Sequence, residues 1–369
     1  MKKSKRLKKN TLINRVRKGF RTFYGSMETP FVESPISVSR KIKKFNKSKE
    51  DKKWMKELLT TNKIVKKFYK RPELEFHDIE NIESVDFLSR DGIRLAGLVY
   101  EPNKDSNKWV IASHWFAGHK TLALHHAKIF SKMGYNILVY DFRGHGHSQD
   151  DTTTMGGKEH MDLMGAVDWL KENRTIDQLA FMGTSMGAFV SNYCSMYYKE
   201  ELKQLNFKFV ISDVTYGSVF SLFMHVRNIY LGFLPKKRTK KFINKVIERQ
   251  NKHEDSINLH EVSIFHLLRE QGNKDLFPTL FLHSTDDKVT SPADTFELLI
   301  RRKFEEDEHL VFNFSMHTQA MRYHFKTFNY KIAEFINRYQ DGNELFDEIV
   351  REWKLLKFEK KDQISLLLK

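Results

Sequence analysis

The alternation of apolar strands with helical segments limits the possible folds more than any other feature of the chain. From about residue 82 to residue 338, short apolar runs alternate with longer segments of helical spacing. The expected strands are SVDFL (84–88), IRLAGLVY (93–100), WVIASH (109–114), YNILVYD (135–141), LAFMG (179–183), FKFVISD (207–213), TLFLHS (279–284) and HLVFNF (309–314). Strands that are apolar almost throughout are typical of a parallel sheet covered by helices on both faces. The fold class is therefore α/β, with a mostly parallel sheet.

One interruption of this alternation predicts a cap. From about residue 216 to 270 the chain is rich in Phe, Lys and Arg at helical spacing, and strands resume only at residue 279. An insertion after the sixth core strand lies at the C-terminal edge of the sheet, where ligands bind in open α/β sheets. We therefore expect one α/β domain over residues 71–369, with a helical cap at about 216–270.

Residues 1–70 differ from the rest of the chain in charge. They hold 18 Lys and 5 Arg against 5 acidic residues, a net charge of +18, whereas the whole chain carries +16. The near-neutral remainder argues against nucleic-acid binding by the folded domain. Apolar residues such as Leu12, Val16 and Phe20 recur at helical spacing among these cations. A basic amphipathic helix of this kind either lies on an anionic membrane surface or packs on the body. We predict a basic, partly helical N-terminal extension over residues 1–70, with both alternatives open.

The sequence shows no sign of export. It contains no run of 18 apolar residues, and Arg15, Arg17 and Lys18 interrupt any signal-peptide core. The single cysteine, Cys194, has no partner for an internal disulfide, and we expect it to be a buried packing residue. The predicted location is cytoplasmic, with peripheral contact at the inner face of the membrane as an option for residues 1–70.

The sharpest motif is GTSMG (183–187), which joins an apolar strand to a helix rich in Ala, Val, Tyr and Met. A tight strand-to-helix turn holds a serine in a strained conformation, and Gly183 and Gly187 lack the Cβ atoms that would clash there. The serine then lies beside a helix N-terminus, whose free N–H groups favour negative charge. We therefore predict that Ser185 is a nucleophile, which needs a neighbouring base.

Six segments carry a family resemblance. They are Asp91-Gly92, SHWFAG (113–118), YDFRGHGHS (140–148), GTSMG (183–187), HSTDD (283–287) and His317. In this order they resemble the α/β-hydrolase superfamily, specifically the bacterial esterase/lipase-like proteins grouped with serine aminopeptidase S33 and monoacylglycerol-lipase-like hydrolases. The resemblance covers about residues 82–338. It implies an eight-stranded sheet with a helical cap after strand six, and hydrolysis of an ester, thioester or amide bond.

The resemblance also implies a triad in the chain order Ser, Asp, His. The base should follow the last strand, which favours His317 over His324, because the latter falls in or next to the terminal helix. The acid should follow the strand 279–284, where the usual pattern H-G-x-x-D points to Asp287 and leaves Asp286 as the rival. The carboxylate would hold the imidazole and stabilise its charged form.

An oxyanion hole requires two backbone donors. The resemblance implies the N–H groups of Met186 and Phe116, although Trp115 stands where the family pattern has glycine. In the segment 140–148, Asp141 and Arg143 are expected to brace loops.

The predicted function is hydrolysis of an acyl or lipid-derived carboxylic ester by Ser185, His317 and Asp287 through an acyl-enzyme. The substrate would be a small-molecule acyl ester, bound by apolar cap residues. Those cap residues are Phe220, Leu222, Phe223, Tyr230, Leu231 and Phe233. No H-E-x-x-H or paired Cys/His motif occurs, so neither a metal nor a cofactor is expected. The alternatives are an S33-like aminopeptidase, a thioesterase, and an inactive hydrolase-like domain tethered to a membrane or partner; the acyl and alcohol groups and the oligomeric state stay open.

Overall fold

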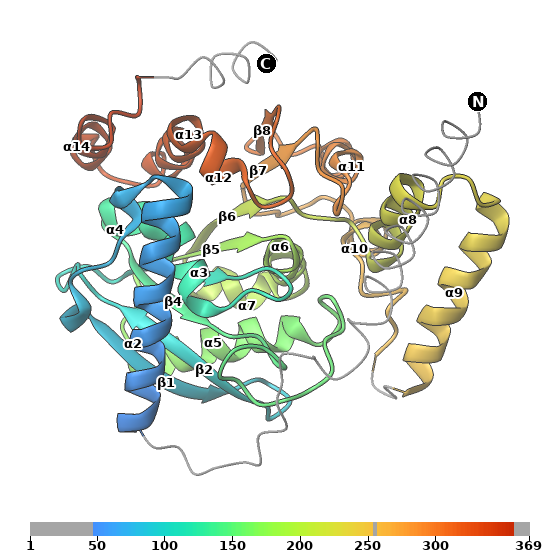
Figure 1. The fold of residues 1–369 in the computed structure, drawn as a ribbon, viewed down its shortest axis with the longest axis horizontal. Helices are drawn as coiled ribbons and strands as arrows, with labels where there is room; N and C mark the ends of the chain where they lie inside the picture. The colour runs from blue at the N-terminus through green and yellow to red at the C-terminus, as the bar shows by residue number, and fades with distance from the viewer. Residues whose placement is uncertain (1–46, 254–256, 358–369) are drawn as a thin grey trace, which may run out of the picture.

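A single eight-stranded sheet forms the centre of the computed structural model, which describes residues 47–253 and 257–357 (Figure 1). The strands are β1 (Ile82–Leu88), β2 (Arg94–Tyr100), β3 (Lys108–Ser113), β4 (Asn136–Tyr140), β5 (Gln178–Thr184), β6 (Phe207–Asp213), β7 (Thr279–Ser284) and β8 (Glu308–Phe312). Their order is β1-β2-β4-β3-β5-β6-β7-β8, in which β1, β2 and β4 pair antiparallel and every other neighbouring pair is parallel. The predicted mostly parallel sheet is confirmed.

Helices cover both faces of the sheet. They are α2 (Lys47–Ile64), α3 (Lys120–His126), α4 (Lys128–Lys132), α5 (Glu159–Asn173), α6 (Met186–Tyr197), α7 (Lys199–Gln204), α8 (Val219–Tyr230), α9 (Lys236–His253), α10 (Ile264–Gln271), α11 (Pro292–Arg302), α12 (Ala320–Tyr323), α13 (Phe325–Asn337) and α14 (Glu344–Glu352). Between β3 and β4 the chain forms two short helices, α3 and α4, which meet at Ala127.

The alternation of side chains along each strand divides the core in two. On β5, Leu179 and Phe181 join a cluster with α5, α6 and the cap, whereas Ala180 and Met182 join a second cluster with α2, α3, α4, α13 and α14. Successive side chains of a strand point to opposite faces, so a strand buried on both sides must be apolar throughout. All five residues of β4 are accordingly buried. Cys194 of α6 is fully buried in the first cluster, as predicted.

The described part of the N-terminal segment packs on the face of the sheet that carries the second core cluster. Trp54 and Leu58 of α2 are 3% and 0% exposed, and both belong to the second core cluster. The Asn62 amide donates to the Phe76 carbonyl oxygen at 2.8 Å and accepts from the Phe76 N–H at 3.0 Å. Residues 54–69 therefore pack as part of the sheet domain. Residues 1–46 lie outside the described residues, so their contact with a membrane stays a prediction.

The β6–β7 connection forms the cap. It contains α8, α9 and α10, and α9 is the outermost of them in Figure 1. Ser218 starts α8 with a capping box, in which its hydroxyl accepts the Ser221 N–H and the Ser221 hydroxyl accepts the Ser218 N–H. Within the described ranges, the structure contains no helix that is both long and apolar enough to cross a bilayer.

Candidate active site

Ser185 occupies the turn between β5 and α6. Its φ of 56° and ψ of −111° lie in a backbone region that residues other than glycine rarely adopt. Its N–H donates to the Asp213 carbonyl oxygen at 2.8 Å. A Cβ on Gly183 would lie 2.2 Å from the Gly187 carbonyl carbon, and one on Gly187 would lie 2.3 Å from the Ser113 carbonyl oxygen. The two glycines therefore permit the sharp turn that the sequence predicts.

The structure brings the three predicted side chains into one hydrogen-bonded line. The distance from Ser185 Oγ to His317 Nε2 is 2.9 Å, and that from His317 Nδ1 to Asp287 Oδ2 is 2.7 Å. Because a carboxylate only accepts, Nδ1 carries the proton and Nε2 presents its lone pair to the serine hydroxyl. The Asp287 side chain is fully buried, whereas the His317 ring is 17% exposed. This geometry suits removal of the serine proton.

The environment separates Asp287 from its neighbour Asp286. Asp287 Oδ1 accepts the Val289 and Thr290 N–H groups at 2.8 and 2.9 Å. Burial alone would raise the pKa of Asp287, but His317, His283 and the Val289 N–H lower it to about 2. The exposed Asp286 instead accepts the Phe314 N–H at 2.8 Å. The structure therefore places Asp287, and not Asp286, against the base.

The rival histidine lies elsewhere. His324 is fully buried, and its Nε2 donates to the Asn313 carbonyl oxygen at 2.7 Å. That bond anchors the start of α13 to the loop after β8. His324 therefore supports the loop that carries His317, and the structure does not bring it to Ser185.

The two predicted oxyanion donors are both available. Among the described residues, neither the Phe116 N–H nor the Met186 N–H has a hydrogen-bond acceptor. The loop that carries Phe116 is a turn, in which the Gly118 N–H donates to the Trp115 carbonyl oxygen at 2.8 Å and Ala117 has a φ of 63°. The left-handed position thus falls on Ala117, which explains why Trp115 can replace the glycine of the family pattern.

Two buried histidines that the sequence analysis left without a role brace this loop. His114 Nε2 accepts the Phe142 N–H at 3.1 Å, and its Nδ1 donates to the Trp115 carbonyl oxygen at 2.6 Å. His145 Nε2 accepts the Ala117 N–H at 3.1 Å. These bonds require neutral rings, and burial lowers the pKa of His114 to about 3 and also lowers that of His145. The sequence contains one indication of a role for these two histidines, because they lie in the segments 113–118 and 140–148 that carry the family resemblance.

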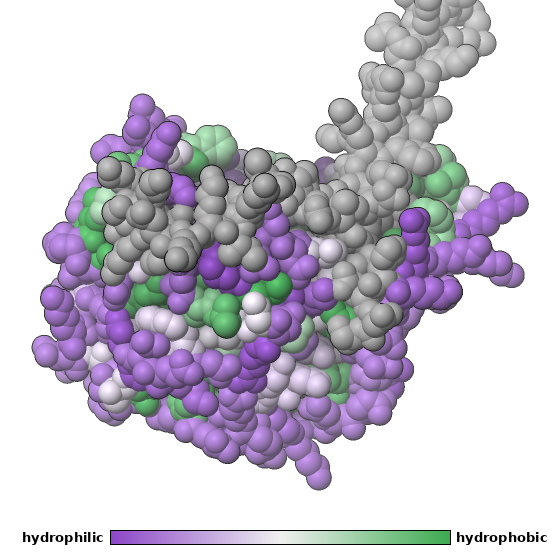
Figure 2. All heavy atoms as spheres, turned by 90° about the horizontal axis from the view of Figure 1, so that it is seen from below, coloured by the Kyte–Doolittle hydropathy of each residue, from purple (hydrophilic) through white to green (hydrophobic). Residues whose placement is uncertain are grey.

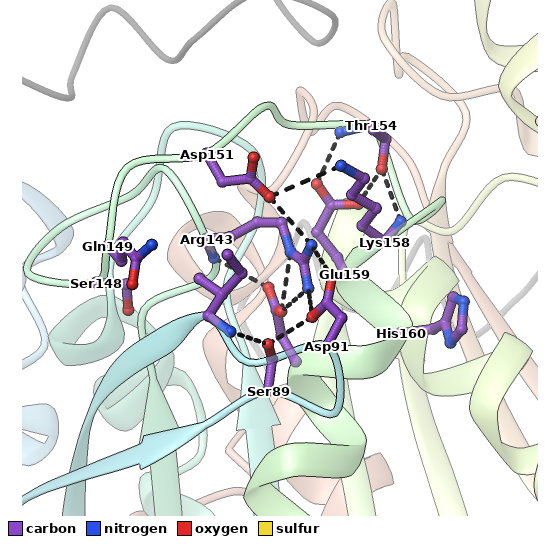
Figure 3. A network of polar contacts seen from close by, with 12 residues as sticks. Ser89, Asp91, Arg143, Ser148, Gln149, Asp151, Thr154, Lys158, Glu159 and His160 are labelled. Carbon is purple, nitrogen blue, oxygen red and sulfur yellow. Dashed lines mark hydrogen bonds and ion pairs between the residues drawn. The ribbon is translucent and has the colours of Figure 1, made fainter. Parts of the chain in front are cut away.

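Arg143 joins the neighbouring loops in a buried ionic network (Figure 3). Its side chain is fully buried, and its guanidinium donates to Asp91, Asp151 and Asp162 over 2.6–3.1 Å. Asp141 joins its loop to the start of α3. It accepts the Lys120 N–H at 2.7 Å and pairs with the Lys120 ammonium at 2.6 Å. Both predicted bracing roles are confirmed.

The cap contacts the loop that carries the acid. His225 of α8 donates from Nε2 to the Asp287 carbonyl oxygen at 3.0 Å. Asp294 of α11 accepts the Gly217 N–H at 2.9 Å and the Ser221 hydroxyl at 2.5 Å, which ties the start of α8 to the body. The sequence analysis missed His225 and Asp294, because each acts on a segment more than 60 positions away.

The cap residues expected to line an apolar pocket have mixed positions. Leu222, Phe223 and Leu231 are at most 2% exposed and belong to the first core cluster. Phe220 and Tyr230 are partly buried against that cluster, and Phe233 is 62% exposed. Within residues 47–253 and 257–357, no group of three His, Cys, Asp or Glu side chains is arranged to hold a metal ion.

Comparison with known proteins agrees with this fold. The model of the X-Pro dipeptidyl-peptidase (S15) family matches residues 91–234. The uncharacterized protein YqkD of Bacillus subtilis is 32% identical over 117 residues, which are 31% of this chain and 38% of YqkD. The match thus spans well under half of that relative.

Two solved esterase structures share the architecture. The esterase Pf2001 of Pyrococcus furiosus is 23% identical, with a TM-score of 0.53 over 73% of this chain and 95% of its own. An esterase of Pyrobaculum calidifontis is 14% identical, with a TM-score of 0.50 over 80% and 94%. The chain therefore has the α/β-hydrolase fold, as predicted.

Proposed function

We propose that the protein is a serine hydrolase that cleaves a carboxylic ester through an acyl-enzyme. The single observation that carries the proposal is the line from Ser185 Oγ through His317 to Asp287, with contacts of 2.9 and 2.7 Å. This is the arrangement in which a base removes the serine proton while a buried carboxylate stabilises the imidazolium.

In the first step His317 Nε2 takes the serine proton as Ser185 Oγ bonds to the ester carbonyl carbon. The negative charge that develops on the carbonyl oxygen is met by the N–H groups of Phe116 and Met186. The imidazolium returns its proton to the departing alkoxide, so an alcohol leaves and an acyl-serine remains. His317 then removes a proton from water as the water oxygen bonds to the acyl carbon. The imidazolium returns this proton to Ser185 Oγ as the bond between Oγ and the acyl carbon breaks, which releases a carboxylic acid and restores the serine.

A small acyl or lipid-derived ester is the proposed substrate. Partly buried Phe116, Val289 and Phe220 offer apolar surface beside the first core cluster, which suits an acyl group. The same chemistry serves a thioester.

A peptidase is the second candidate, because the matched family model describes X-Pro dipeptidyl-peptidases. A peptidase of that kind also forms an acyl-serine. The two candidates differ in the leaving group, which is an alkoxide for an ester and an amine for a peptide.

A substrate panel separates these candidates. Three proteins would be assayed on p-nitrophenyl esters of graded chain length, acyl thioesters and X-Pro nitroanilides. They are wild type, Ser185→Ala and the control Ser191→Ala, which changes a buried serine of α6, the helix that follows Ser185. We expect ester hydrolysis by wild type and Ser191→Ala and none by Ser185→Ala. A preference for nitroanilides would favour the peptidase. Failure on every substrate by a folded protein would favour the inactive, tethered domain.

A cytoplasmic location and contact of residues 1–70 with an anionic membrane remain part of this proposal. Fractionation of cells into membrane and soluble parts would test both.

A further inference from the structure

The outer helix of the cap has an unusual concentration of positive charge. α9 contains eight Lys and Arg residues and a single acid, Glu248, within eighteen positions. The eight cations are Lys236, Lys237, Arg238, Lys240, Lys241, Lys245, Arg249 and Lys252, and all are exposed. The chain after residue 70, which we predicted to be nearly neutral, therefore includes a strongly basic local surface. Its net charge is near zero because acidic residues elsewhere offset these cations.

The charges gather on one side of the helix. Thr239, Ile243 and Ile247, spaced four apart, are at most 7% exposed and form the face that packs inward. Six cations project within about 60° of the opposite direction at 100° per residue. They are Lys237, Arg238, Lys241, Lys245, Arg249 and Lys252, which we call the basic face. All six are exposed, so this face points to solvent. α9 lies at the right-hand margin of the molecule in Figure 1, and the same margin is strongly hydrophilic in Figure 2.

No ion pair neutralises the basic face within the part of the chain that the structure describes. Among the described residues, none of its six cations forms an ion pair or a side-chain hydrogen bond with another residue. Elsewhere on the surface, cations such as Arg90 and Arg174 are paired with two carboxylates each. Six like charges on one face repel one another, so an external polyanion would relieve that repulsion.

Exposed apolar side chains stand next to the charges. Phe233, in the turn between α8 and α9, is 62% exposed, and Ile229 near the end of α8 is 43% exposed. A nucleic-acid backbone would engage the cations alone, whereas a lipid surface accepts both cations at its headgroups and apolar side chains at its interface. The apolar face of α9 itself is buried, so the helix would remain folded on the cap when it binds.

We propose that the basic face of α9, together with Phe233 and Ile229, docks the protein on an anionic lipid surface. The same cap helix bundle reaches the acid of the site through His225 and Asp287. Docking through α9 would therefore bring the cap side of the site to the membrane. The proposal does not depend on catalysis, because Ser185→Ala should bind as wild type does.

Vesicle co-sedimentation of the full chain tests this proposal. Wild type, a basic-face variant (Lys241→Glu, Lys245→Glu, Arg249→Glu) and a control variant with the same charge change would be mixed with phosphatidylglycerol-containing vesicles or with phosphatidylcholine vesicles. The control changes three exposed lysines outside the cap helices α8, α9 and α10, namely Lys104→Glu, Lys274→Glu and Lys303→Glu. Thermal unfolding would establish that all three proteins are folded.

The basic-face variant should partition onto phosphatidylglycerol-containing vesicles at least about tenfold less than wild type, since each cation near such a surface contributes favourably. The control should stay within about twofold, and high salt should weaken wild-type binding. Equal losses in the two variants would assign binding to overall charge or to the N-terminal segment and would overturn the proposal. Wild-type binding to phosphatidylcholine vesicles that equals its binding to phosphatidylglycerol-containing vesicles would overturn the proposal as well. The proposal would also fail if wild type bound a DNA duplex at least as tightly as the anionic vesicles and the basic-face variant lost both kinds of binding equally.

Discussion

Replacement of Arg143 by Met should destabilise the protein strongly, because among the described residues its guanidinium is the only cation paired with the buried Asp162 carboxylate. Both side chains are fully buried, and the ion pair between them is 2.6 Å long. Arg143 uses its donors on Asp162 (2.6 and 2.9 Å), Asp91 (2.7 Å twice) and Asp151 (3.1 Å). Although burial alone would lower the pKa of Arg143, Asp162 and Asp91 raise it, so it is charged at any accessible pH.

The size of the effect follows from burial. Removing one partner of a buried ion pair costs about 3–5 kcal/mol. Burial raises the pKa of Asp162 to about 7 even though Arg143 lowers it, so without Arg143 this carboxyl group either stays charged without compensation or takes up a proton. Met matches the length of the Arg stem, so the loss of packing is small. Arg90→Met is the matched control: Arg90 also forms bonds of 2.6–2.8 Å with two acids, but its side chain is 26% exposed. An exposed pair contributes about 1 kcal/mol or less.

Urea unfolding followed by circular dichroism measures both free energies. We expect Arg143→Met to lower the unfolding free energy by about 3–5 kcal/mol and Arg90→Met by about 1 kcal/mol or less. Adding Asp162→Asn to Arg143→Met should recover part of the loss, because it removes the stranded charge. Equal costs for the two Met variants would refute the reasoning that burial sets the magnitude.

Three other changes test the site and its surroundings. Asp287→Asn should lower kcat by about 10⁴ in steady-state ester hydrolysis, because the amide favours the wrong imidazole tautomer, whereas the exposed Asp286→Asn should not. Burial and the charge of Asp287 raise the pKa of Asp213 to about 8, so Asp213 contributes stability that is present below about pH 4 and lost as the pH rises through 8. The free energy of unfolding of wild type should therefore decrease between about pH 4 and pH 8, and Asp213→Asn should reduce that decrease by a few kcal/mol. An unchanged dependence of the unfolding free energy on pH would contradict this. Ala117→Gly should stabilise the protein by about 0.5–1 kcal/mol in urea unfolding by relieving a φ of 63°, whereas Ala123→Gly in α3 should destabilise it by about 1 kcal/mol or more.

The strands and the order of the site segments were predictable because their signals are local. The apolar runs at 179–183 and 279–284 read as buried strands, and β5 and β7 lie there. The turn around Ser185 was equally readable, since only glycine fits at positions 183 and 187. Short-range chemistry of this kind is visible in any single sequence.

The supporting contacts were not predictable because they join distant positions. His145 acts on Ala117 across 28 positions, and His225 acts on Asp287 across 62. Each histidine looks like a surface residue until the fold buries it or brings it to a backbone group. The apolar residues of α2 read as part of a separate extension for the same reason: only the folded sheet provides the surface that buries Trp54 and Leu58.

The most direct test of the proposed chemistry is covalent labelling by a fluorophosphonate, mapped by mass spectrometry of the digested protein. A proton acceptor 2.9 Å from Ser185 Oγ should make that hydroxyl uniquely reactive. The account predicts one modified peptide, which contains Ser185, and loss of labelling in both Ser185→Ala and His317→Ala. Labelling of a different residue, or no labelling of the folded wild-type protein, would contradict it.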